Sequence, residues 1–212
     1  MSAPARGVRF RRSAAVVAAA GFMLAAAGAL RAAEPPAEPR FSLAVAAGGF
    51  LASDSAVSKV YPSLGIPVQV RVGWRFAGPW TLFAGFRFLR MSGTTVIVGT
   101  AIDAESYAVR LTVSAWQAGF RWQAKAGRWT FRLEAGASRF AYEEAWTGAA
   151  FDVKGTSFGG FGGGGVEWAL TPWLAAAGGL EYGILPTRSG GRLAGKPDLG
   201  GMDGMFGLIL RF

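Results

Sequence analysis

The chain has 212 residues, enough for one or two domains, and contains neither cysteine nor histidine. This composition excludes disulfides, thiolate nucleophiles and metal sites built on cysteine or histidine. The formal net charge is +9, but segment 1–33 holds five arginines and no acid. The remainder has 17 basic and 13 acidic residues, too small and too scattered an excess to indicate a nucleic-acid partner.

The first 33 residues have the features of a secretory signal peptide. Arginines come first, an apolar run extends from Ala14 to Leu30, and small residues follow. Ala27-Gly28-Ala29 fits a small-x-small cleavage site, so we expect cleavage within residues 29–33. A retained membrane anchor is the alternative, but the run is short for a helical span. The proline-rich residues 34–39 are expected to form a short periplasmic leader.

From residue 40 to residue 212, apolar residues alternate with polar or small ones. In Ile66–Phe76 the even-numbered positions hold isoleucine, valine, tryptophan or phenylalanine, and the odd-numbered ones hold proline, glutamine, arginine or glycine. Successive side chains of a strand point to opposite faces, so this alternation predicts strands with one apolar and one polar face. It recurs in the segments 80–88, 129–138, 158–170, 174–184 and 206–212.

One segment changes phase. The apolar residues of 109–113 are odd-numbered, whereas those of 116–122 are even-numbered. One extra residue in a strand exchanges its two faces. We therefore expect a β-bulge near Ser114-Ala115 that places both sets of apolar residues on the same face.

Three short turns are bracketed by tryptophans, in the segments WRFAGPWT, WQAKAGRWT and WALTPW. They alternate with four longer polar connections at 51–64, 90–106, 143–156 and 186–201. Three tight turns and four long loops join eight strands, with both chain ends on the tight-turn side. The predicted fold of residues 40–212 is therefore an all-β, eight-stranded, antiparallel up-and-down barrel.

The composition of the two faces indicates which one meets lipid. A soluble barrel also has period two, but it needs a dense polar exterior, and the polar face here is mostly glycine, alanine, serine and threonine. Tryptophans also gather beside the tight turns, as in the aromatic girdle of a transmembrane β-barrel. The predicted girdle consists of Trp74, Trp80, Trp122, Trp129, Trp168 and Trp173.

The last residues, FGLILRF, place Phe206, Leu208, Leu210 and Phe212 on one face of a final strand. This ending resembles the terminal signature of bacterial outer-membrane β-barrels, and the whole of 40–212 resembles their small eight-stranded members, the OmpA-like transmembrane domain and its relatives. The resemblance implies an outer-membrane location, contact with membrane lipid, and recognition of the terminal signature by the barrel-assembly machinery.

Charged and amide residues on the polar face are expected to point into the barrel. An eight-stranded barrel is just wide enough for side chains to fill, so these groups must pair with one another or with water. We expect a structural plug; a gated polar passage is the alternative, and Phe83 and Phe161 on the same face suggest a third possibility, a small cavity for an apolar ligand. The predicted polar network comprises Gln69, Arg71, Arg75, Arg87, Arg132, Glu134, Glu167, Glu181 and Arg211.

Two motifs suggest enzymes but lack the required context. Residues 155–159 match G-x-S-x-G, yet the sequence has no histidine to accept the serine proton. Residues 160–165 match G-x-G-x-x-G, but no helix is expected after them, so a phosphate cradle is not predicted. The barrel enzymes that this fold resembles all depend on a histidine. We therefore expect no enzymatic activity and no cofactor.

The sequence thus predicts a non-enzymatic outer-membrane barrel with a structural or surface-interaction role through the four long loops, which are the candidate sites for an extracellular ligand. A narrow channel or carrier for small apolar molecules is the alternative.

Overall fold

A computed structural model describes residues 39–62, 64–98, 104–148, 152–187 and 197–212 of the chain. The predicted signal peptide at 1–33 and all of the leader but Pro39 lie outside the described residues. The described residues of the barrel belong to one compact unit that spans Pro39–Phe212.

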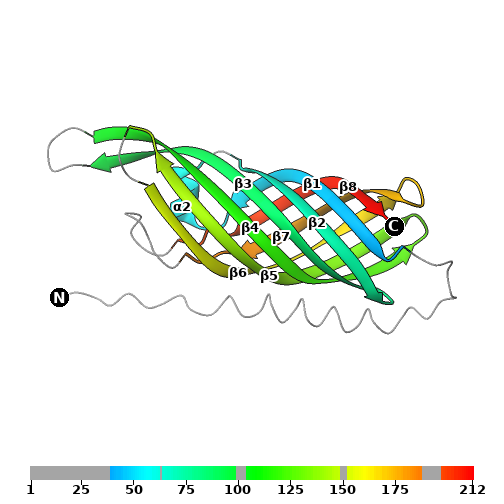
Figure 1. Cartoon of the computed structure of the whole chain (residues 1–212). Helices are drawn as coiled ribbons and strands as arrows, with labels where there is room; N and C mark the ends of the chain where they lie inside the picture. The colour runs from blue at the N-terminus through cyan, green and yellow to red at the C-terminus, as the bar shows by residue number, and fades with distance from the viewer. Residues whose placement is uncertain (1–38, 63, 99–103, 149–151, 188–196) are drawn as a thin grey trace, which may run out of the picture. The chain divides into compact units, whose positions relative to one another are not determined.

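Eight antiparallel strands close into a barrel in which each strand pairs with its neighbours in sequence (Figure 1). The predicted eight-stranded up-and-down topology is thereby confirmed. Figure 1 also shows the C-terminus at the end of the barrel opposite to the short helix α2 (Ser55–Val60). The strands are β1 (Phe41–Ala52), β2 (Ile66–Ala77), β3 (Trp80–Val98), β4 (Ala104–Ala126), β5 (Trp129–Trp146), β6 (Asp152–Ala169), β7 (Leu174–Ile184) and β8 (Gly201–Arg211).

The first and last strands close the barrel. β1 pairs with β8 without interruption from Ser42↔Arg211 to Ala52↔Gly201. Beyond this ladder, the Phe41 and Phe212 backbones exchange two hydrogen bonds of 3.0 and 2.9 Å. Pairing therefore continues to the last residue of the chain, which satisfies backbone groups that an open edge would leave exposed.

The predicted β-bulge near Ser114-Ala115 is wrong. β4 keeps one continuous register with β3 and with β5 through these residues. Val109, Leu111 and Val113 point into the barrel instead and are at most 2% exposed. Near the long loops, the inward positions of β4 hold apolar residues. The apolar residues therefore change from even to odd numbers, although the two faces of the strand do not exchange.

The strands run further than the sequence indicated. β3 continues to Val98 and β4 begins at Ala104, so most of the predicted loop 90–106 is strand. The predicted loop 51–64 contains helix α2. The Asp54 carboxylate caps this helix by accepting a 2.8 Å hydrogen bond from the Ala56 amide. This helix buries Val57, which is 1% exposed.

Glycine allows large interior side chains to pack against the wall. A Cβ atom placed on Gly136 would lie 2.7 Å from the Phe161 ring and 2.3 Å from the Ala118 carbonyl oxygen. On Gly163 it would lie 2.4 Å from the Leu180 carbonyl oxygen of the neighbouring strand. These glycines therefore permit close approach of strands and rings in a narrow, strongly curved barrel.

Candidate functional site

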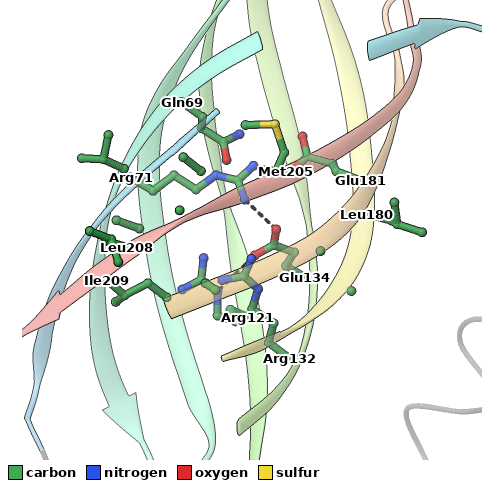
Figure 2. A pocket seen from close by; sticks show the side chains of 17 residues that line it. Gln69, Arg71, Arg121, Arg132, Glu134, Leu180, Glu181, Met205, Leu208 and Ile209 are labelled. Atoms are coloured by element: carbon green, nitrogen blue, oxygen red, sulfur yellow. Dashed lines mark hydrogen bonds and ion pairs between the residues drawn. The ribbon is translucent and has the colours of Figure 1, made fainter. Parts of the chain in front are cut away.

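The centre of the interior is an ion-paired cluster around Arg71, which β2 directs inward. Its guanidinium donates to the Glu134 carboxylate at 2.6 Å and also pairs with Glu181 (Figure 2). Arg121 donates to the second oxygen of Glu134 at 3.0 Å. The four side chains come from β2, β4, β5 and β7, and each is at most 7% exposed. The cluster thus ties opposite walls of the barrel together.

Amide side chains complete this central layer. The Gln117 carbonyl oxygen accepts from Arg71 at 3.0 Å, and the Gln117 amide nitrogen donates to Glu181 at 3.1 Å. The side-chain amides of Gln69 and Gln117 are 2.9 Å apart. Burial of these charges is tolerable because several partners surround each of them.

A second layer lies toward the tight-turn end and centres on Glu167. Its carboxylate, 1% exposed, accepts from Arg211 at 2.5 Å and from Arg132 at 3.4 Å. The Gln123 amide donates to it at 3.3 Å. Arg75 lines the small cavity that also contacts Glu167 and Arg211. Glu167 is therefore the acid shared by this layer.

A third layer lies toward the long loops, where Arg87 forms a bidentate pair with Asp203. The two hydrogen bonds measure 2.9 and 2.8 Å, and both side chains are at most 4% exposed. The Arg87 guanidinium also lies 5.3 Å from the centre of the Phe50 ring. Two parallel bonds fix the orientation of both groups as well as their distance.

Aromatic rings support the central cluster from within. Phe83 and Phe161 lie 5.9 Å apart between ring centres, and the Arg71 guanidinium lies 4.8 and 5.2 Å from them. Arg121 lies 5.3 Å from the Phe83 ring. The sequence suggested these two rings as the lining of an apolar cavity. In the structure, arginine guanidinium groups lie over the rings instead.

Above these layers, at the long-loop end, the interior is apolar. We call this part the upper core; its buried residues are Phe50, Val57, Tyr61, Leu89, Met91, Val109, Leu111, Val113, Ala115, Phe140, Tyr142, Leu185 and Leu199. Val57 and Tyr61 belong to helix α2 and its C-terminal cap, so the β1–β2 connection contributes to the core from above.

Two polar groups of this connection have shifted pKa values. Burial, reinforced by the nearby Glu144 carboxylate, raises the pKa of the Tyr61 hydroxyl well above its usual range. The Asp54 carboxylate accepts a 3.0 Å hydrogen bond from the Asp198 amide, and this bond, together with that from Ala56, lowers the pKa of Asp54. The β1–β2 and β7–β8 connections are thereby joined across the mouth.

The cavities found at the three layers, among the residues that the structure describes, are small. Cavities at the central layer, the Glu167 layer and the Arg87 layer have volumes of about 30, 20 and 10 Å³. A single water molecule needs roughly 10–15 Å³ on this measure. These cavities therefore have room for about one to three water molecules each and for no larger solute.

All nine residues of the predicted polar network lie at inward strand positions. Other polar members of these layers, among the described residues, were absent from that prediction: Thr81, Gln117, Arg121, Gln123 and Asp203. The alternation of the sequence could have placed these residues inside the barrel. Gln117 and Arg121 alternate with the outward Trp116 and Phe120, and Asp203 shares parity with Arg211.

The outward positions carry the predicted girdle and terminal residues. Trp129 and Trp168 stack across β5 and β6 with ring centres 6.0 Å apart, and Trp80 is in register with Trp122. Five of the six girdle tryptophans are exposed, and Trp122 is half-buried. Phe206 and Leu208 are exposed by 76 and 52% on the outer face of β8, where Leu210 is half-buried, and Phe212, directly after β8, is 65% exposed.

The two enzyme-like motifs lie within strand β6. Ser157 is buried and inward-facing, with no turn into a helix after it. Among the described residues, no group of carboxylates could hold a metal ion, and no helix is long and apolar enough to cross a membrane.

No protein-family model and no curated protein matches the sequence. Solved structures do match over four-fifths of the chain. Outer membrane protein OprG from Pseudomonas aeruginosa gives a TM-score of 0.61 at 11% identity, covering 82% of this chain and 96% of that one. Neisserial surface protein A gives 0.54 at 17% identity, covering 81% and 97%.

The chain has the fold of the small eight-stranded outer-membrane β-barrels. A third match supports this statement: the N-terminal β-barrel domain of Pseudomonas aeruginosa OprF, with a TM-score of 0.51 at 9% identity, covers 82% of this chain and 100% of that one. At these identities the likeness concerns the fold alone.

Proposed function

We propose that the chain is a non-enzymatic outer-membrane β-barrel protein with a closed interior, which acts through its long-loop end. The observation that carries this proposal is the interior itself, where three ion-paired layers lie beneath an apolar upper core. A barrel whose interior is filled in this way leaves its loops as the surface on which an extracellular partner can bind. The connections between the strands at this end, which overlap the predicted loops 51–64, 90–106, 143–156 and 186–201, are therefore the candidate sites for an extracellular partner.

Membrane residence is supported by the apolar outer surface of the strands. Val68, Val70, Val72 and Trp74 are each at least 40% exposed, although they are apolar and sit in regular strand. Such a surface is costly in water and favourable in hydrocarbon, where a closed barrel leaves no backbone group unpaired.

Fractionation of cells that express the full chain tests this location. We expect the protein in outer membranes, with faster gel migration unheated than boiled, because the closed barrel stays folded in detergent until it is heated. Recovery in the soluble periplasmic fraction, with no effect of heating, would contradict the proposal.

We further propose that Phe206, Leu208, Leu210 and Phe212 form the element that the barrel-assembly machinery recognises, and that the girdle tryptophans lie at the membrane boundary. Phe212→Asp should lower the folded fraction in outer membranes, because a carboxylate replaces a ring at the lipid boundary of the closing strand. Leu64→Asp is the matched control, since Leu64 is 59% exposed but lies outside the strands. Equal folded fractions for the two variants would exclude an assembly role.

A further inference from the structure

Three exposed arginines lie on the outer face of the strands near the long-loop end. They are Arg90 on β3, Arg110 on β4 and Arg139 on β5, and we refer to them as the outer arginine cluster. The strands that carry them are long: β3, β4 and β5 have 19, 23 and 18 residues, whereas β1, β2, β7 and β8 have 11 or 12.

The distance from the aromatic girdle places this cluster at the opposite edge of the apolar outer surface. Arg90 follows Trp80 by ten residues, and Arg139 follows Trp129 by ten. A tilted strand crosses the hydrocarbon core in about 9–11 residues. If the girdle marks one boundary, the arginines therefore stand at the other, where lipid headgroups begin.

The strand registers make two of the three arginines neighbours. Arg90 pairs with Thr112 and Ser92 pairs with Arg110, so the two arginines are diagonal neighbours on one face. Such positions are typically about 7–8 Å apart, close enough for two guanidinium groups to reach one phosphate. Arg139 stands apart from this pair, because it is in register with Trp116, six residues along β4 from Arg110. Its neighbours Trp116 and Phe158 are 66 and 62% exposed.

The acidic neighbour of Arg110 whose side chain the structure describes is already paired. This residue, Glu143, is a diagonal neighbour of Arg110 on the outer face and pairs with Lys154 at 2.9 Å. Within the residues that the structure describes, none of the three arginines forms an ion pair. On the other side of the barrel, the outward residues at the loop ends of the strands are apolar: Leu51, Ile66, Ile184 and Met202.

We propose that the outer arginine cluster binds the phosphate groups of an anionic lipid in the membrane leaflet at the long-loop end. The proposal rests on the membrane location proposed above. A planar guanidinium matches phosphate oxygens in a bidentate manner. The exposed Trp116 and Phe158 beside Arg139 provide an apolar surface for acyl chains, which favours a phosphorylated lipid over a soluble polyanion.

Native mass spectrometry of the barrel released from nanodiscs tests this site. The nanodiscs contain phosphatidylcholine with or without diphosphoryl lipid A, and the lipid A retained per barrel is measured. Replacing Arg90, Arg110 and Arg139 by Gln should lower retention roughly fivefold for each arginine removed. The matched control replaces Arg40, Lys125 and Arg128 by Gln, which removes the same charge at the tight-turn end and should leave retention unchanged.

Equal retention by the wild type and the cluster variant would overturn the proposal, as would binding of a soluble sulfated polysaccharide that lipid A cannot displace. Heat-modifiable migration of every variant verifies folding. A wild-type barrel that retains lipid A in nanodiscs but is absent from outer membranes in cells would contradict the proposed location alone.

Discussion

The two halves of the barrel interior are filled by different kinds of side chain. Toward the tight turns, arginines and carboxylates fill the space in ion-paired layers, whereas toward the long loops the filling is apolar. An apolar core stabilises by removing hydrocarbon from water, and it tolerates approximate geometry. A buried ion pair offsets its own desolvation only when every partner is present. The difference indicates that the polar half is the more sensitive to loss of a single group.

Glu134→Gln should give the largest effect, because this carboxylate serves both Arg71 and Arg121. Leaving buried arginine charge without its partner typically costs about 3–5 kcal/mol of unfolding free energy. Urea unfolding of the barrel in lipid vesicles, followed by heat-modifiable gel migration, measures this cost. Glu143→Gln is the control, since that exposed ion pair contributes only about 0–1 kcal/mol. Similar unfolding midpoints for the two variants would show that lumenal water replaces the missing partner.

Leu89→Ala tests the apolar half. Leu89 is fully buried in the upper core, and deleting its side chain should cost about 2–4 kcal/mol of unfolding free energy. Leu82→Ala, on the outer face of the same strand, should cost less because Leu82 is 40% exposed and no packed cavity forms there. If Leu89→Ala lowers the unfolding free energy more than Glu134→Gln does, the polar half is not the more sensitive of the two.

Replacing Tyr61 should have the smallest effect on the free energy of unfolding, and this effect depends on pH. Its pKa is higher in the folded protein than in the unfolded chain, so the folded protein holds the hydroxyl proton more tightly. The resulting stability is fully present below about pH 10, the unfolded pKa, and is lost as the pH rises toward the folded pKa. Unfolding midpoints measured across this alkaline range should fall more steeply for the wild type than for Tyr61→Phe. Parallel curves would mean that Tyr61 is solvated.

The sequence predicted the barrel and its outward surface because strand alternation is a local property. Phe83, Glu134 and Glu181 could be placed inside by parity alone. The upper core could not be recognised in this way, since an apolar residue such as Leu111 has the same pattern whether it meets lipid or the interior. The result was a predicted bulge where the strand is regular. Partner choice, such as Arg87 with Asp203 across 116 residues of sequence, depends on barrel closure and is invisible to local patterns.

The polar and apolar halves together close the interior of the barrel. Single-channel recording of the refolded wild-type barrel in planar lipid bilayers tests it most directly, with heat-modifiable migration verifying that the inserted protein is folded. We expect no discrete conductance steps, because the cavities at the layers have room for only about one to three water molecules each. Reproducible, long-lived open steps from the folded wild-type protein would contradict it.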